Sequence, residues 1–250
     1  QKLTTLNEVL SQTAGVSVKE YDSARQYYYS RGFEITDLLI DGVPTLFDPG
    51  WGTGENNAST AMYEQVEIVK GATGLMTGSG SPAGAINLVR KRADSTDFNG
   101  TVALGAGNRE QRNGMVDVAA ALNANRSLRG RAVVSHEQED SFREIGASQR
   151  SLLYLTSELD LTASTLLTVG GSHQRDKNDG ATWGGLPIWY SDGSRSQYGR
   201  SDTTAADWTY WDSAYTNLFA EVQQQLSPDW ALHARANHGI TDGESRLLYV

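Results

Sequence analysis

Residues 66–89 have the sequence VEIVKGATGLMTGSGSPAGAINLV, which is two short apolar segments joined by a glycine-rich connection. β-Branched and aliphatic residues predominate in Val66–Val69 and in Ala85–Val89, as is typical of strands. Five of the fourteen residues from Gly71 to Gly84 are glycine. Glycine at this density indicates backbone with positive φ or close packing against another surface. The stretch therefore predicts two strands and a tightly packed connection.

These glycines do not form a nucleotide-binding loop. A phosphate-binding P-loop has the pattern GxxxxGK[ST], and here no lysine follows the glycines at that spacing. A dinucleotide-binding turn has GxGxxG at the start of a helix, whereas Gly78, Gly80 and Gly84 are spaced GxGxxxG and Pro82 leads into a strand.

Composition excludes several classes of protein. The 250 residues contain no cysteine, so they hold no disulfide, thiol nucleophile or thiolate metal site. The net charge of −9 argues against a protein that binds nucleic acid through phosphate contacts. The sequence contains no run of 18 apolar residues, so it does not predict a transmembrane helix.

The N-terminal part predicts a small α/β unit. Thr5–Ser11 predicts a short helix with a capping box formed by Thr5 and Glu8, ending by Gly15. Strands are expected from Val16, over Tyr27–Phe33 and over Leu38–Ile40, and Asp41-Gly42 predicts a turn. Thr60–Gln65 is expected to form a helical turn.

From residue 100 onward, apolar and polar residues alternate, which indicates strands. The expected strands cover 100–106, 115–123, 130–137, 152–160, the region of Leu167 and Val169, 214–226, 230–240 and 246–250. Their connections alternate between tight and wide, which is typical of outer-membrane barrels. The widest, Gln174–Asp212, is rich in tryptophan and tyrosine and predicts a folded recognition loop.

Two long motifs resemble a known family. YYYSRGFEITDLLIDGVP (27–44) and YEQVEIVKGATGLMTGSGSPAGAINLVRKR (63–92) resemble the plug domain of TonB-dependent outer-membrane receptors, in particular those for ferric siderophores of the coprogen and pyoverdine type. The resemblance implies an α+β plug over 1–95, truncated at its N-terminus. It also implies that 96–250 form the first part of an antiparallel transmembrane β-barrel, truncated at its C-terminus, with about eight of about 22 strands.

The resemblance also implies a function. Such a receptor binds a ferric siderophore of hydroxamate or mixed type outside the cell and carries it into the periplasm. Its partners are the siderophore, outer-membrane lipid and TonB, the last through a segment missing from this chain, and it has no covalently bound cofactor. Charged plug residues, with Glu67, Lys70, Arg90 and Arg92 as candidates, are expected to hold the plug to the wall.

Candidate ligand-binding residues come from the plug and from the aromatic loop. In the related hydroxamate receptors the arginine of the RGF motif contacts the ligand, and this maps onto Arg31, whose alternative role is an ion pair with Glu34 or Asp37. A rigid guanidinium suits chelate oxygens. Aromatic side chains supply flat contact surface, and packing is their alternative role. The aromatic candidates are Tyr29, Phe47, Trp51, Trp183, Trp189, Tyr190 and Tyr198.

An enzyme is not indicated. His136, His173, His233 and His238 are expected on separate strands without metal-binding spacing, and no GxSxG motif occurs. Two alternatives to siderophore uptake stay open: a transporter for another chelate such as cobalamin or heme, and a soluble β-sandwich for binding or adhesion. In the sandwich, the Leu and Val side chains of 100–250 would meet in a central core.

Overall fold

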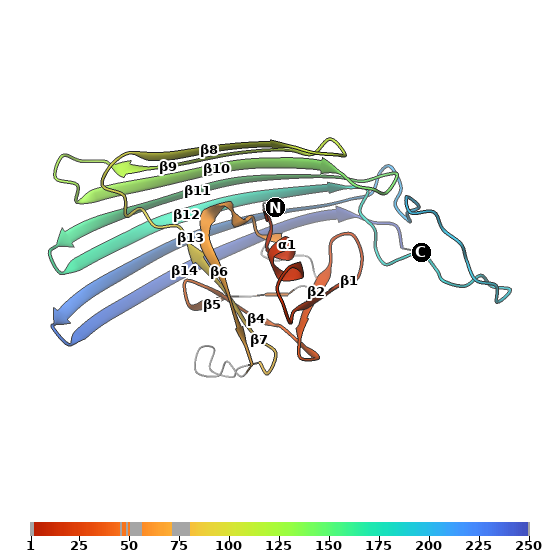
Figure 1. Ribbon diagram of the computed structural model, residues 1–250, viewed down its shortest axis with the longest axis horizontal. Helices are drawn as coiled ribbons and strands as arrows, with labels where there is room; N and C mark the ends of the chain where they lie inside the picture. Colours follow the sequence, from red (N-terminus) through yellow and green to blue (C-terminus); the bar gives the residue numbers. More distant parts are fainter. Residues whose placement is uncertain (1–2, 46, 49, 51–56, 72–80, 250) are drawn as a thin grey trace.

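The computed structural model describes residues 3–45, 47–48, 50, 57–71 and 81–249. In this part of the chain, a curved seven-stranded antiparallel sheet carries a smaller α/β assembly on one side (Figure 1). We call the large sheet, β8 to β14, the wall, and the elements from α1 to β7 the plug. Trp51 lies outside the described residues.

The plug begins with a short capped helix. In α1 (Leu6–Ser11), Thr5 and Glu8 form the predicted capping box, and the helix ends at Ser11, before Gly15. The next three strands, β1 (Ser17–Glu20), β2 (Gln26–Ser30) and β3 (Phe33–Glu34), form an antiparallel sheet.

The single strand expected over Tyr27–Phe33 is wrong. Arg31 and Gly32 have φ of +54° and +83° and form a two-residue turn between β2 and β3. Such turns need positive φ at both positions. Because the first position here is Arg31 and not a glycine, the sequence gives little indication of the turn.

Residues 66–89 contribute to two adjacent strands of a second sheet, which has the order β5-β4-β7-β6. Its strands are β4 (Asp37–Ile40), β5 (Val43–Thr45), β6 (Tyr63–Lys70) and β7 (Gly84–Arg90). The predicted Asp41-Gly42 turn joins β4 to β5, and Thr60–Met62 forms the 3-10 helix η3 before β6. Gly84 has φ of +133°, and a Cβ there would lie 2.2 Å from the Val69 carbonyl oxygen, so this site requires glycine.

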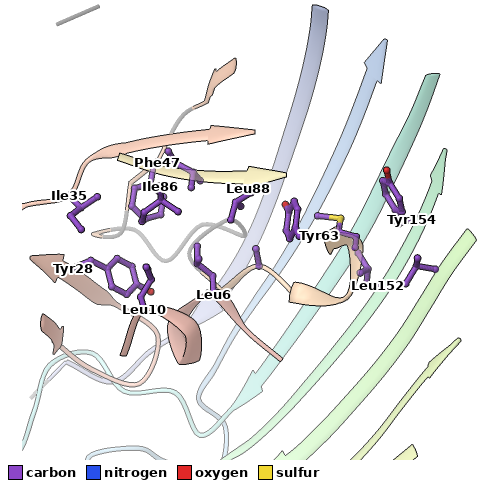
Figure 2. Packing of buried hydrophobic residues seen from close by; sticks show 14 of the residues in the cluster. Leu6, Leu10, Tyr28, Ile35, Phe47, Tyr63, Ile86, Leu88, Leu152 and Tyr154 are labelled. Atoms are coloured by element: carbon purple, nitrogen blue, oxygen red, sulfur yellow. The ribbon is translucent and has the colours of Figure 1, made fainter. Parts of the chain in front are cut away.

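The plug core lies between α1 and the two small sheets, and it continues onto the wall. Leu6, Leu10 and Tyr28 pack near Ile86, while Tyr63 is directed toward the wall residues Leu152 and Tyr154 (Figure 2). Because one apolar cluster contains residues from both parts, burial of apolar surface helps to hold the plug against the wall.

The wall strands are long and follow each other in sequence order. They are β8 (Asn99–Ala106), β9 (Arg112–Ala121), β10 (Leu128–Asp140), β11 (Ala147–Thr162), β12 (Thr165–Asp179), β13 (Tyr210–Ser227) and β14 (Trp230–Arg246). The further strand expected over Arg246–Val250 is wrong for the described residues, because β14 itself reaches Arg246 and 247–249 are not a strand. The wide connection is 180–209, since β12 and β13 extend into the segment expected as loop.

The wall has a polar inner face toward the plug and an apolar outer face. On β11, Leu152, Tyr154 and Glu158 are buried toward the plug, whereas Leu153 and Leu155 are about half exposed on the other side. The sheet is thus a single layer whose Leu and Val side chains point away from the plug, so the two-layer sandwich is wrong. Among the described residues, no helix has the length and apolar character needed to cross a membrane.

Candidate ligand-binding site and plug attachment

The turn between β1 and β2 lies against the base of the 180–209 connection. Asp22 organises this turn, because its carboxylate accepts hydrogen bonds from the backbone amides of Ala24 (3.0 Å) and Arg25 (2.9 Å). The same carboxylate accepts from the Arg25 Nε at 2.7 Å. Asp22 and Arg25 are both buried, so the ion pair fixes the direction of the guanidinium.

Arg25 stacks on aromatic rings that come from distant parts of the chain. Its guanidinium carbon lies 3.9 Å from the ring centroid of Trp183 and 5.1 Å from that of Tyr21. Trp183 stacks in turn on Trp211, with centroids 5.6 Å apart. We call Tyr21, Arg25, Trp183 and Trp211 the junction cluster. Arg25 and Trp211 are buried, whereas Trp183 is half-buried and Tyr21 is exposed. The cluster therefore offers partly exposed rings beside an ion-paired cation, a combination that suits a planar group of a ligand.

Hydrogen bonds attach the turn to the loop base directly. The Ser23 amide donates to the Thr182 hydroxyl at 3.2 Å, and the Thr182 amide donates to the Ser23 hydroxyl at 2.8 Å. This reciprocal pair joins plug and wall at the end of the wall where the aromatic loop leaves it (Figure 1). The junction cluster is therefore held from both sides.

A polar cavity of about 410 Å³ adjoins this turn, between the plug and the wall. Asp22 and Ser23 line it from the plug, and Arg150 and Asp176 line it from the wall. Its volume is within the range of small-molecule pockets, although its lining is more polar than is usual for them. The cavity provides hydrogen-bonding groups next to the aromatic surface of the junction cluster.

The predicted plug residues do not gather at this junction. Arg31 is exposed on the β2–β3 turn beside Gly71, at the opposite end of β2 from Arg25, which is a span of about 20 Å for a strand. Tyr29 is half-buried on the same strand. Phe47 is buried in the plug core and stacks on Tyr28 with centroids 6.2 Å apart, so it serves packing in this structure.

The structure divides the predicted loop aromatics into two groups. Trp183 belongs to the junction cluster. Trp189, Tyr190 and Tyr198 are exposed farther out, where Trp189 pairs with Arg195 in an isolated bridge and the Tyr198 hydroxyl donates to the Pro187 carbonyl at 2.9 Å. The latter three residues thus form an outer aromatic surface on a folded loop.

Sequence reasoning missed three members of the junction cluster: Tyr21, Arg25 and Trp211. Trp211 could have been predicted from strand alternation. It lies an even number of residues from Tyr215 and Asn217 on β13, and these two side chains point inward. The D-x-x-R spacing of Asp22 and Arg25 fits a side-chain-capped turn but does not indicate a partner. The contact between Arg25 and Trp183 joins distant positions and has no local signature.

A second attachment lies where the chain leaves β7. Arg92 donates to the carboxylates of Glu158 at 2.6 Å and Glu221 at 3.0 Å. Burial of the guanidinium disfavours its charge, but the two carboxylates outweigh this effect and raise the pKa of Arg92. Lys91 pairs with Asp117 at 2.8 Å, which brings β9 into the contact.

Of the four charged plug residues that were expected to contact the wall, two do so. Arg90 reaches the wall, with hydrogen bonds to Asn217 at 2.6 Å and Asn237 at 3.0 Å, and Arg92 does so as described. Glu67 and Lys70 instead bond within the plug, to the Asn87 amide at 2.7 Å and to the Ala14 carbonyl. The expectation that these two residues join the wall is therefore wrong.

Residues 1–85 match the TonB-dependent receptor plug domain. The chain is 35% identical over 240 residues to the ferripyoverdine receptor of Pseudomonas aeruginosa, an alignment that covers 95% of this chain and 29% of the relative. It is 36% identical to the ferric-pyoverdine BN7/BN8 receptor of Pseudomonas putida, with the same coverage of both chains. The chain belongs to the TonB-dependent outer-membrane receptors.

A solved structure supports the same arrangement of plug and wall in three dimensions. The ferripyoverdine receptor of the outer membrane of Pseudomonas aeruginosa, bound to ferripyoverdine, superposes with a TM-score of 0.93 at 34% identity. That match covers 97% of this chain and 32% of the other. The wall of this TonB-dependent receptor is accordingly part of a barrel in the outer membrane of a Gram-negative bacterium. The chain spans about three tenths of the length of these relatives.

Proposed function

We propose that the receptor to which this chain belongs binds a ferric siderophore of the pyoverdine class and imports it into the periplasm in a TonB-dependent manner. The names of the most similar relatives and the geometry of the junction cluster support this function. A ferric siderophore presents hydroxamate or catecholate oxygens, often with net negative charge, to a neighbouring cation. The function is transport, without a chemical step on the ligand.

The single observation that carries the proposal is the stacking of Arg25 on Trp183, 3.9 Å apart, at the contact between plug and loop base. A ligand that binds there touches the plug and the wall together. Its arrival can therefore alter the contact between them, which uptake through a plugged barrel requires. We propose Arg25, Trp183 and Trp211 as inner contacts and Trp189, Tyr190 and Tyr198 as outer ones.

The chemistry of the described residues fits a ligand that arrives with its iron already enclosed. The sequence contains no cysteine, and the described residues include no group of three or more His, Asp or Glu side chains placed to hold a metal ion. Binding then depends on shape, stacking and charge rather than on coordination of iron.

The remaining parts of the proposal concern domains and partners. Residues 1–95 are proposed as plug and 96–250 as the first part of the barrel wall. TonB is proposed as the partner that drives uptake, as the family name implies. Arg31 stays a candidate only for a ligand that extends from the junction cluster to the far end of β2.

The test is binding of purified ferric siderophores to cells that carry the full-length receptor. We expect Arg25→Ala and Trp183→Ala each to weaken binding of a recognised ferric pyoverdine by about tenfold or more, since each removes a stacking partner. Arg25→Lys keeps the charge but loses the planar fork, so an intermediate loss is expected. Arg31→Ala tests the alternative site at the other end of β2, and receptor amount on the cell surface is measured for every variant.

Two results would contradict the proposal at different levels. Unchanged affinity in both Arg25→Ala and Trp183→Ala would remove the junction cluster from the ligand site, and a loss confined to Arg31→Ala would move the site to the other end of β2. Failure of the intact receptor to support growth on any member of a ferric siderophore panel under iron limitation would overturn the function itself.

A further inference from the structure

Gln174 on β12 is a wall residue whose side chain bonds to the backbone of the plug. Its Oε1 accepts from the Ser59 amide at 2.8 Å, and its Nε2 donates to the Asn57 carbonyl at 3.2 Å. The same Nε2 donates to the Asp176 carboxylate at 2.6 Å. Gln174, Ser59 and Asp176 are all buried, so their polar groups depend on one another for hydrogen bonds.

The partners of the Gln174 amide permit only one orientation of this side chain. A backbone N–H can only donate and a backbone carbonyl can only accept, so Oε1 faces Ser59 and Nε2 faces Asn57. An ionised carboxylate also only accepts, and Asp176 therefore stabilises the same orientation. A donor in place of the Asp176 acceptor would turn the amide and release the Ser59 N–H.

Arg150 on β11 holds the Asp176 carboxylate from its other side. The Nε of Arg150 donates to Asp176 Oδ1 at 2.7 Å, whereas Gln174 donates to Oδ2. Arg150 also faces Glu137 on β10 at 3.5 Å. A charge-assisted hydrogen bond is stronger than one from a neutral amide. When residue 176 can serve only one of its two partners, it therefore serves Arg150.

The Arg150–Asp176 pair lines the polar cavity that adjoins the junction cluster. Asn57 and Thr5 line the same cavity from the plug side. A ligand oxygen in the cavity that accepts from Arg150 competes with Asp176 for the guanidinium. The contents of the cavity thus act on the pair that sets the orientation of Gln174.

The plug segment that is held in this way is paired with the start of the helix α1. Thr5 and Ser59 form an isolated antiparallel bridge, and the Leu6 amide donates to the Ala58 carbonyl at 2.9 Å. Thr5 is also the residue that caps α1. A shift of Ser59 is therefore passed to residues 4–6 through backbone hydrogen bonds.

We propose that Gln174 is a positioning residue that couples the contents of the polar cavity to the placement of plug residues 57–60 and 4–6. A ligand group that draws Arg150 toward the cavity takes the Asp176 carboxylate with it. Nε2 of Gln174 then loses its acceptor, and the hold on Ser59 weakens. The identity of the ligand rests on the proposed function, whereas the action of Asp176 on Ser59 does not.

The first test exchanges the two side chains in the full-length receptor without ligand, and hydrogen exchange reports on the amides of 58–60. Gln174→Glu sets two carboxylates against each other, and Asp176→Asn cannot accept from both of its donors. We expect about tenfold faster exchange in each. Gln174→Glu/Asp176→Asn again has an acceptor for Ser59 and one for Arg150, so exchange is expected within about threefold of the wild type.

The matched control is Gln225→Glu, which adds the same charge at an exposed position of β13. Its amide donates to the Ser227 carbonyl at 2.6 Å, in the turn to β14. We expect exchange of 58–60 to be unchanged in this variant. Unchanged exchange of the β6 and β7 amides verifies that each variant is folded.

The second test adds a saturating amount of a ferric pyoverdine that the receptor binds. In the wild type we expect the ligand to speed exchange of 58–60 by about threefold or more, because the hold of Gln174 weakens. In Gln174→Met the Ser59 amide has no side-chain acceptor to lose, so the ligand is expected to have no such effect.

Four outcomes would contradict the expectations. Losses that add in the exchanged double variant would show that the two side chains act independently and would overturn the coupling. Unchanged protection in both single variants would exclude Gln174 as a positioning residue. An equal response to the ligand in the wild type and Gln174→Met would also overturn the proposal. If no ferric siderophore binds, the proposed function fails, while the first test still decides whether Asp176 acts on Ser59 through Gln174.

Discussion

At the scale of single residues, Arg92 makes the most consequential contact between plug and wall. Its guanidinium bridges Glu158 on β11 and Glu221 on β13, and donates to Thr168 on β12 between them at 3.0 Å. Both glutamates are buried, so a carboxylate without its partner carries a desolvation cost. Arg129 and Arg235 also face these glutamates, at 3.6 and 3.2 Å, which limits that cost.

We predict that Arg92→Ala loosens the attachment of the plug by about 1–3 kcal/mol, which is below the usual cost of breaking a buried ion pair. Its side chain is 35% exposed, and the glutamates keep other partners. Hydrogen exchange of the β7 amides in the full-length receptor measures this opening energy. The control is Arg126→Ala, whose pair with Asp97 at 3.3 Å is exposed on both sides and contributes little. Equal exchange in the two variants would contradict the prediction.

At the scale of secondary-structure elements, α1 depends on its cap. A helix of six residues is too short to be stable alone, so the hydrogen bonds at its N-terminus matter more than usual. The Thr5 hydroxyl accepts from the Glu8 amide at 3.1 Å, and the Glu8 carboxylate accepts from the Thr4 amide at 2.6 Å. Leu6 and Leu10 can then pack into the plug core.

We predict that Thr5→Ala destabilises α1 by about 1 kcal/mol, because the Glu8 amide loses its acceptor. Faster hydrogen exchange at the amides of 8–10 would show this. The comparison variant is Ser11→Ala, which removes an exposed hydroxyl that bonds only to the Glu8 carbonyl within the helix. Its effect is expected to stay within about 0.5 kcal/mol. The cap has no special role if both substitutions have the same effect.

At the scale of the whole molecule, several separate attachments hold the plug to the wall. They include the Ser23–Thr182 pair with the junction cluster at the loop end, the hydrogen bond from the Ser59 amide to the Gln174 side chain at 2.8 Å, and the Arg90–Arg92 segment. Tyr63 of the plug also lies toward the wall residues Leu152 and Tyr154, within one apolar cluster (Figure 2). Opening a path for a bulky ligand requires at least one of these attachments to separate.

We predict that a disulfide between Ser23→Cys and Thr182→Cys blocks uptake while binding of the ferric siderophore is retained. The two short side chains each reach the other's backbone amide, so the Cα atoms are expected within the ~4.4–6.8 Å that a disulfide spans. The measurement is uptake of radioactive iron under oxidising conditions and after addition of dithiothreitol. The single variant Ser23→Cys is the control. Full uptake by the oxidised double variant would show that this attachment stays closed during transport.

Local signals in the sequence predicted much of the fold. The capping box of Thr5 and Glu8, the Asp41-Gly42 turn and the alternation along 152–160 each depend on residues a few positions apart. The same alternation puts His233 of β14 on the inward side, 3.9 Å from Glu221. Strand ends and the Arg31-Gly32 turn were harder to predict from the sequence, because hydrogen bonds to a neighbouring strand decide where a strand stops or bends.

The sequence by itself determined that a glycine-rich α/β unit precedes strands with one polar and one apolar face. It did so because alternation, caps and turns result from interactions between near neighbours. Only the tertiary structure decided that Arg25 meets Trp183, that Phe47 is buried and that Arg92 reaches Glu158 and Glu221 on separate strands. Stacking, burial and cross-strand register depend on how distant segments are brought together, and no short stretch of sequence records that.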